Sequence, residues 1–216
     1  MLAITEIRQT SSEEIVKMTS SDGAVFFVRK CYLNVVSVDS LVNRVDSAGF
    51  GGAVLSEEES EDVVSAAFAF GAETKAAEYL ARCEQCRFKL AQKLLQKKFP
   101  QDAVDAALDR LESKGLLDDS RFASAWVRSH CATKYQGRSR LLSELLSRGI
   151  SREVAVSALD SFFSGDEDGG GVSEEEMCAK ALGKGIRLGK SGDKLLKYLL
   201  DCGFPYGMAR RAMRGE

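Results

Sequence analysis

The side chains that could carry out chemistry are few. The 216-residue chain has a single histidine, His130, and six cysteines. A hydrolase of the Ser-His-Asp or Cys-His type would need His130 as its general base. Cys131 is its neighbour, but adjacent residues on a helix point in different directions. The sequence therefore predicts that His130 lies on a surface or half-buried helical face, and that the chain is not an enzyme.

Two short motifs resemble binding sites but lack essential parts. Cys83 and Cys86 form a C-x-x-C pair inside a helical pattern, where residues three apart share a face and could bind one metal ion. A structural zinc site needs a second pair, and the sequence has none with C-x-x-C or H-x-x-x-H spacing. The segment 189–191, Gly-Lys-Ser, resembles the end of a phosphate-binding loop, but three residues separate it from Gly185 where that loop requires four. We expect no metal and no cofactor. A zinc or thiol enzyme based on the cysteine pair remains an alternative, which metal analysis would test.

The basic residues are the more promising functional class, because charge is unevenly distributed. Residues 1–73 carry 5 Lys/Arg and 12 Asp/Glu, residues 74–163 carry 16 and 11, and residues 177–214 carry 9 and 2. Arg138 and Arg140 follow Gly137 at the start of an expected helix, where cations oppose the helix dipole, which favours binding as their role. Cations at helix ends and turns can bind a polyanion or an acidic protein surface. The candidate partner-binding or DNA-binding residues are Lys97, Lys98, Lys134, Arg138, Arg140, Arg148, Arg152, Lys190, Lys194, Arg210 and Arg211.

These cations must be positioned by a repeated unit, since one segment occurs three times. Residues 94–99, 145–150 and 199–204 align without gaps at offsets of 51 and 54, and an Ala-apolar pair follows each at the same distance. Such copies are supersecondary units that bury their apolar faces by stacking. Each copy has the pattern of three helices, near 74–86, 87–98 and 101–114 in the first and near 173–184, 191–202 and 205–214 in the third. Gly149 and Gly203 are suited to the left-handed conformation that ends a helix, and Lys98 occupies the same position in the first copy.

The residues before the repeats differ in character. Alternating apolar residues on either side of 21–23, Ser-Asp-Gly, predict a small β-hairpin, and residues 36–45 a short helix. Ser56 and Glu59 form a capping box that begins a helix extending to about Phe70. The expected domains are 1–52 (N-terminal extension), 53–73 (connecting helix), 74–117, 118–163 and 173–216 (repeats), and 164–172 (flexible acidic and glycine-rich linker). Without a signal peptide or a long apolar run, we expect a cytoplasmic protein with reduced cysteines.

The repeats resemble those of the RecX family of recombinase regulators. The string Gly-Leu-Leu-Asp-Asp-Ser-Arg-Phe-Ala at 115–123 is the most recognisable part, and 79–82, 93–99 and 137–150 continue the match. The resemblance covers about residues 74–214. Cys83, Cys86 and Lys89 depart from the family pattern, as does Arg138, where proline is common.

The resemblance implies a mainly α fold of three tandem three-helix repeats in an elongated curved array, with the small β-hairpin and helix as an N-terminal extension. It further implies a monomeric regulator of DNA repair, recombination and the SOS response. Such a regulator binds the RecA recombinase and its DNA filament, and usually restrains filament growth, ATP hydrolysis and strand exchange. The alternative is a stand-alone nucleic-acid-binding helical repeat protein. Modest net charge and few aromatics expected on the surface disfavour it, because single-strand binders usually carry stacking platforms. Phe122 and Trp126, four apart, are expected to be buried between repeats.

Overall fold

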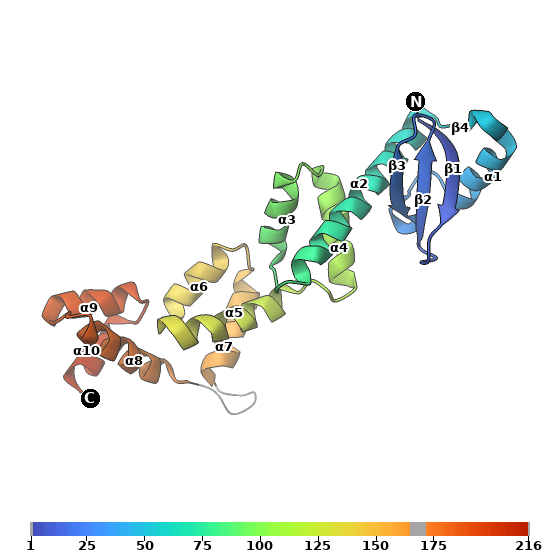
Figure 1. Cartoon of the computed structure of the whole chain (residues 1–216). Helices are drawn as coiled ribbons and strands as arrows, with labels where there is room; N and C mark the ends of the chain where they lie inside the picture. Colours follow the sequence, from blue (N-terminus) through green and yellow to red (C-terminus); the bar gives the residue numbers. More distant parts are fainter. Residues whose placement is uncertain (1, 165–171, 216) are drawn as a thin grey trace. The chain divides into compact units, whose positions relative to one another are not determined.

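The computed structural model describes residues 2–164 and 172–215 and shows a mainly helical protein with a small N-terminal sheet (Figure 1). This confirms the predicted fold class. The chain divides into two compact units, one made of residues 1–83 and 90–117 and the other of residues 84–89 and 118–216. The linker predicted at 164–172 lies almost entirely outside the described residues.

The N-terminal sheet is larger than the predicted hairpin. Three antiparallel strands, β1 (Ala3–Gln9), β2 (Ile15–Ser20) and β3 (Val25–Arg29), follow one another, and the short β4 (Ala53–Val54) pairs with β1. The sheet order is therefore β3-β2-β1-β4, with all neighbours antiparallel. The predicted hairpin around residues 21–23 is confirmed as β2 and β3, and the sheet adds β1 and β4 to it. The short β4 has only two residues, too few for an alternating pattern to be visible.

One face of this sheet packs on helices. Between β3 and β4 lie two 3₁₀ turns, η1 (Lys30–Tyr32) and η2 (Gly49–Gly51), and the helix α1 (Val38–Ala48). The long helix α2 (Glu57–Leu80) begins at Ser56, whose hydroxyl accepts from the Glu59 N–H in the predicted capping box. The shared core comprises Ile4, Met18, Val28, Leu41, Leu55, Val63 and Ala66, all buried.

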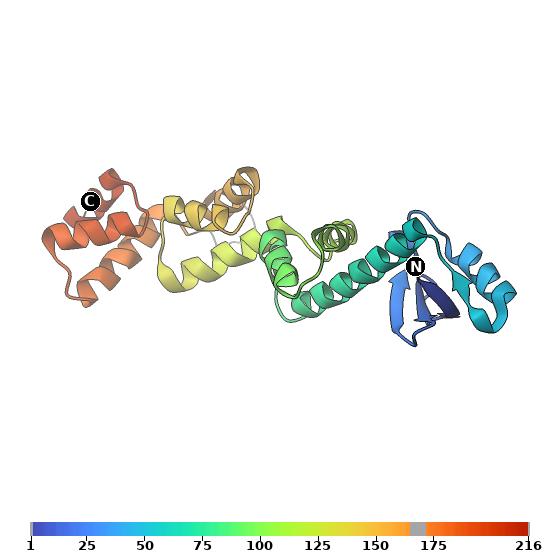
Figure 2. The same ribbon diagram turned by 90° about the horizontal axis from the view of Figure 1, so that it is seen from above.

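Helix α2 is continuous, which corrects the prediction of two helices separated near residue 73 (Figure 2). Gly71 does not end it. A β-carbon there would lie 3.2 Å from the Phe99 ring, so glycine serves close packing against the first repeat. The N-terminal half of α2 therefore covers the sheet, and its C-terminal half is the first helix of repeat 1.

A network of charged side chains ties the sheet to α2 and α4 (Gln101–Ser113). Arg29 donates from Nε and Nη2 to the two Glu73 carboxylate oxygens at 2.9 and 2.7 Å, and the Tyr32 hydroxyl donates to Glu73 at 2.8 Å. Arg110 Nε lies 3.6 Å from Glu73, and Glu14 accepts from both arginines at 2.6 Å. Burial and the hydrogen bond to Glu73 raise the pKa of Tyr32.

Repeat 1 is completed by α3 (Arg87–Gln96) and α4, with Leu90, Leu94, Val104 and Leu108 in its core. Lys98 ends α3 with φ of 69° and Gly115 follows α4 with φ of 67°, as the sequence predicts for left-handed helix ends.

Repeats 2 and 3 each contain three helices whose ends follow the expected signals. Asp118 caps the first helix of repeat 2 by accepting from the N–H groups of Ser120 and Arg121, and Ser173 caps the first helix of repeat 3. Gly149 and Gly203 have φ of 80° and 92°, which confirms their predicted left-handed conformation. The helices are α5 (Asp119–Lys134), α6 (Arg138–Leu146), α7 (Arg152–Ser164), α8 (Glu174–Arg187), α9 (Gly192–Asp201) and α10 (Tyr206–Arg214).

One apolar core runs through both repeats of the second unit. It includes Val127, Leu141 and Leu159 from repeat 2 and Leu199 and Phe204 from repeat 3. Phe122 and Trp126 pack against this core but are only half-buried, so the prediction that both are buried is confirmed only in part.

Candidate interaction surface

The basic residues predicted to bind a partner fall into two groups, according to whether the described residues include an acidic or backbone partner for them. Arg138 forms an ion pair with Asp160, and Arg140 Nε donates to Glu144 at 2.9 Å. Arg148 Nη1 donates to the Glu144 carbonyl oxygen at 2.7 Å. These contacts correct the argument that stability gives no reason for arginines at the start of α6. Each arginine there has a carboxylate partner that offsets the unfavourable helix dipole.

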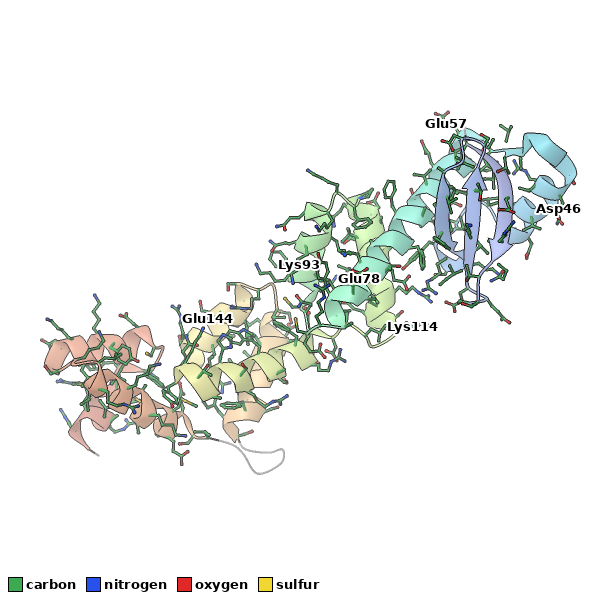
Figure 3. All side chains as sticks on the ribbon, in the orientation of Figure 1. Asp46, Glu57, Glu78, Lys93, Lys114 and Glu144 are labelled. Carbon is green, nitrogen blue, oxygen red and sulfur yellow. The ribbon has the colours of Figure 1, made fainter. Side chains whose placement is uncertain are left out.

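Glu144 is the centre of this arrangement on α6 (Figure 3). Its Oε1 accepts from Arg140 Nε and from Gln136 Nε2 at 2.9 and 3.0 Å, and Arg148 Nη1 lies 3.9 Å from Oε2. Burial opposes ionisation, but these hydrogen bonds lower the pKa of Glu144. The structure thus brings Arg140 and Arg148 together on one carboxylate.

The other candidates are more loosely held. Lys190 lies with Nζ 5.5 Å from the Tyr198 ring, and Arg210 with Cζ 5.8 Å from the Tyr206 ring. Within the described residues, no ion pair is found for the exposed side chains Lys97, Lys98, Lys134, Arg152, Lys194 and Arg211. Lys97 and Lys98 lie in the first unit and the other candidates in the second.

A repeated contact, which the sequence did not reveal, holds the second unit together. At the start of α6, the Gly137 N–H donates to the Cys202 carbonyl at 2.9 Å, and the Arg138 N–H donates to Glu174 Oε1 at 2.8 Å. Gly203 packs so closely on α6 that a β-carbon would lie 2.5 Å from the Arg140 backbone nitrogen. The first turn of α6 is thus fixed to the end of α9 and the start of α8.

Residues 86–88 make the same contact with the end of α6. The Cys86 thiol lies 3.4 Å from the Arg148 carbonyl oxygen, to which it can donate, and the Arg87 N–H donates to Asp119 Oδ1 at 2.8 Å. A β-carbon on Gly149 would lie 2.5 Å from that of Phe88. The repeat offsets of 51 and 54 relate Gly137, Arg138, Cys202 and Gly203 to Cys86, Arg87, Arg148 and Gly149, so we call both the repeat contact.

Flat side chains on the first helices of repeats 1 and 2 lie close to cations. In repeat 2, Arg148 Cζ lies 4.6 Å from the centre of the Trp126 ring, and the His130 ring stacks on Trp126 with centroids 3.6 Å apart. In repeat 1, Lys75 and Lys93 lie 5.7 and 5.1 Å from the Tyr79 ring. Tyr79 and His130 are 51 residues apart and so occupy equivalent positions, whereas Lys75 corresponds to Trp126 and Lys93 to Glu144.

The residues suspected of catalysis are not arranged for it. His130 Nδ1 lies 3.1 Å from the Trp126 carbonyl oxygen, and burial together with Lys134 lowers the pKa of His130. Cys131 is buried among apolar side chains, which raises its pKa to about 12. A thiol in this state is neutral, and adjacent positions on α5 separate it from the imidazole.

The C-x-x-C motif lies between helices, not within one. Cys83 is exposed in the turn after α2, and Cys86 is buried just before α3, where burial raises its pKa. This corrects the helical placement. In the described residues, no three His, Cys, Asp or Glu side chains are grouped as metal ligands, and none of the helices has the length and apolar character needed to cross a membrane. Gly189, with φ of 72°, belongs to the turn between α8 and α9.

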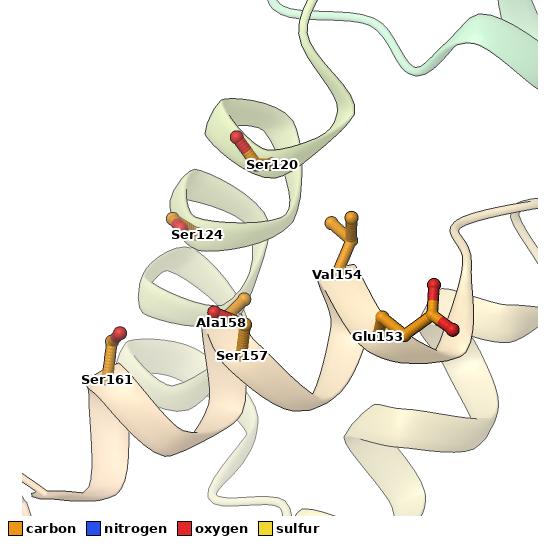
Figure 4. Close-up of a pocket in the computed structure, with 7 residues that line it drawn as sticks. All are labelled: Ser120, Ser124, Glu153, Val154, Ser157, Ala158 and Ser161. Carbon is orange, nitrogen blue, oxygen red and sulfur yellow. The ribbon is translucent and has the colours of Figure 1, made fainter.

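A pocket between α5 and α7 is lined by serine hydroxyls and one carboxylate (Figure 4). Glu153 stands at its edge, and the remaining lining residues are Ser120, Ser124, Val154, Ser157, Ala158 and Ser161. None of these lining residues is a cation, so the pocket is poorly suited to binding an anion.

Comparisons with known proteins identify these helices. The first RecX three-helix domain matches residues 72–111 and the second matches residues 118–159. A regulatory protein RecX from Treponema pallidum is 34% identical over 147 residues, covering 68% of this chain and 86% of the relative. Another from Amycolatopsis mediterranei is 32% identical, covering 59% and 73%.

Solved structures show the same fold at lower sequence identity. The crystal structure of a regulatory protein RecX, 18% identical, superposes with a TM-score of 0.69 and covers all of both chains. The RecX structure from Lactobacillus salivarius, 19% identical, has a TM-score of 0.58 and covers 68% of this chain and 96% of its own. The chain therefore belongs to the RecX family of regulatory proteins.

Proposed function

We propose that this protein binds the RecA recombinase and its DNA filament, and that it restrains filament growth, ATP hydrolysis and strand exchange. Such a regulator acts as a monomer in the cytoplasm, in recombination, DNA repair and the SOS response. The observation that carries the proposal is the match to relatives named regulatory protein RecX, which extends over 68% of the chain.

The surface supports a binding role. Repeats 2 and 3 supply most of the candidate cations, and residues 177–214 have a net charge of +7 from 9 Lys/Arg and 2 Asp/Glu. A filament of DNA and protein offers phosphates and acidic side chains, both of which attract such residues. The described residues offer no arrangement of nucleophile, base and orienting group, which is consistent with regulation by binding.

A second candidate function, binding to nucleic acid without RecA, is favoured by the contacts of Trp126, His130 and Arg148. Stacked flat groups beside cations are typical of single-strand binders. The two functions differ in whether the chain recognises the RecA–DNA filament or bare nucleic acid. Affinity for RecA-coated DNA that exceeds affinity for bare DNA at physiological salt would favour the filament.

The direct test follows RecA on a labelled single strand. With the chain present, we expect slower filament extension, faster net loss of RecA and a lower ATPase rate, each dependent on chain concentration. An unchanged ATPase rate and unchanged filament loss at saturating chain would contradict the proposal. The control for buffer effects is the same solution after the chain has been denatured by heat and removed.

A further inference from the structure

We infer that repeat 2 carries a base-stacking contact for single-stranded nucleic acid, formed by Trp126, His130 and Arg148. The inference deepens the proposed function, on which it rests for its biological setting, by naming the part of the surface that would meet a DNA strand.

The geometry of the three side chains is the first support. The planes of the His130 and Trp126 rings are 25° apart and their centroids 3.6 Å apart, so the rings are stacked. The Arg148 guanidinium packs on the same indole, and its side chain remains 29% exposed. Trp126 and His130 are themselves half-buried. The group therefore reaches the surface while its inner side is held by the core.

The chemistry of these groups is the second support. Unpaired bases stack on aromatic rings and on guanidinium planes, and each such contact is sequence-tolerant. The lowered pKa keeps His130 neutral at pH 7, so the imidazole is available as a flat surface and not as a cation. Lys134, one turn further along α5, is exposed and supplies a charge for the phosphate beside a stacked base.

A ring beside cations in the other repeats is the third support. The offset of 51 relates Tyr79 of repeat 1 to His130, and Lys75 and Lys93 lie over the Tyr79 ring. In repeat 3 the ring is Tyr198, at the position of Glu144, and Lys190 lies over it. Binding to an acidic protein surface would require the cations alone. The pairing of a flat group with a cation in each repeat favours nucleic acid.

The single tryptophan gives this inference a direct readout, because any fluorescence change reports Trp126. We would titrate the folded full chain with oligodeoxythymidylate and, separately, with inorganic polyphosphate, which has the phosphates without the bases. Stacking predicts quenching by the oligonucleotide that polyphosphate does not reproduce. Equal quenching by both, or none by either, would overturn the inference and leave a packing role for the three side chains.

Variants separate flat-group stacking from charge. Arg148→Lys keeps the charge but loses the planar group, and we expect it to weaken oligonucleotide binding roughly ten-fold or more. His130→Ala should weaken binding similarly while keeping the fluorophore. The matched control is Arg8→Lys at an exposed arginine of β1, outside the repeats and outside the candidate binding residues, with no expected change. Thermal melts by circular dichroism establish that each variant is folded. Wild-type affinity in folded Arg148→Lys and His130→Ala would contradict the inference.

The RecA ATPase assay, run in parallel on the wild-type chain, separates this inference from the proposed function. Inhibition of RecA without oligonucleotide-specific quenching would refute the stacking contact alone. Quenching without any effect on RecA would uphold the contact and refute the regulatory proposal.

Discussion

At the scale of single residues, buried and capping carboxylates fix the N-terminal part of each unit. Asp62, which is buried, accepts the backbone N–H groups of Asn34, Val35 and Val36 at 2.9 to 3.2 Å, and so holds the loop before α1. Glu73 holds Arg29 and Tyr32 in the same unit. A carboxylate with this many hydrogen-bond donors is stable in a buried position, whereas a buried charge without its partner destabilises the fold.

The first prediction follows from the Arg29–Glu73 pair, whose side chains are 13% and 11% exposed. Glu73→Ala leaves Arg29 partly buried, with the exposed Glu14 as its carboxylate partner, and should lower the free energy of unfolding by about 3 kcal/mol. Glu78→Ala, which removes an exposed pair with Lys75, is the control and should cost less than about 1 kcal/mol. Urea denaturation measures both, and equal losses would contradict the special role of Glu73.

The second prediction concerns the pH dependence of the Asp118 cap. The Ser120 hydroxyl and the N–H groups of Arg121 and Ser120 lower the pKa of Asp118 below its ordinary value of 3.8. Its contribution is therefore fully present above about pH 4 and is lost as pH falls through the lowered pKa. Asp118→Ala should cost about 1 kcal/mol at pH 7, and this difference should shrink as the pH falls below 4. Urea denaturation of both proteins across that range provides the check, and a difference that grows with acidity would have the wrong sign.

The sequence predicted best those features that depend on single residues and their near neighbours. The cap at Asp118, the capping box at Ser56 and the left-handed ends at Gly149 and Lys98 all depend on neighbours within a few positions. The partners of Arg138 and Arg140 could be predicted less well. Glu144 is one turn from Arg140, but Asp160 lies 22 residues from Arg138 and becomes its neighbour only when α7 packs on α6.

At the scale of elements, the repeat contact explains why two repeats require glycine and the first does not. Gly149 and Gly203 each combine a positive φ with a neighbouring helix start that leaves no room for a β-carbon. Lys98 has the same backbone conformation but is exposed, so only the modest strain of a left-handed residue applies. The sequence predicted the helix end at these positions. Their second role depends on a contact about 60 residues away, which local patterns do not show.

The third prediction separates these two roles of glycine. Gly203→Ala must accept both the positive φ and a β-carbon 2.5 Å from the Arg140 nitrogen, and should destabilise the protein by about 3 kcal/mol or more. Gly189→Ala is the matched control, since its φ of 72° is similar but a β-carbon would meet nothing within 4 Å. It should cost only about 1 kcal/mol. Denaturation midpoints measured side by side distinguish the two, and equal losses would show that backbone conformation alone determines the requirement.

Helix α2 shows that the sequence did not predict every element boundary. The sequence predicted one helix to about Phe70 and another from about residue 74, yet a single helix of 24 residues spans both. Gly71 lies within it. A single glycine lowers helix stability by only about 1 kcal/mol, and the packing of Phe99 against it more than compensates. The sheet and repeat 1 therefore share one helix and one unit.

At the scale of the whole molecule, charge divides the chain into an acidic N-terminal part and basic repeats. The net charge is −7 over residues 1–73 (5 Lys/Arg, 12 Asp/Glu) and +5 over residues 74–163 (16 and 11). Basic surfaces speed association with polyanions, whereas acidic surfaces repel them. A polyanionic partner should therefore meet the repeats before it meets the sheet. The uneven charge was visible in the sequence, but which cations are internally paired was not.

The last prediction tests whether the cations at the start of α6 contribute to that field at a binding site. Arg138 and Arg140 have ion-pair partners in Asp160 and Glu144, and these pairs are at least one-third exposed on the arginine side. Arg138→Ala/Arg140→Ala should therefore cost little stability, about 1 kcal/mol or less. It should weaken association with RecA-coated DNA and, where the contacts are to phosphate, flatten the log–log salt dependence by roughly one unit per contact.

The control for this double variant removes the same charge from the acidic part of the chain. Arg8→Ala/Lys30→Ala changes two exposed cations near the sheet and should leave filament association unchanged. Both variants would be compared at low and physiological salt, after circular dichroism has shown that they are folded. If they weaken association equally, net charge explains the effect and the start of α6 has no special part in it. If only the α6 variant weakens association, the arginines serve binding as well as their internal ion pairs.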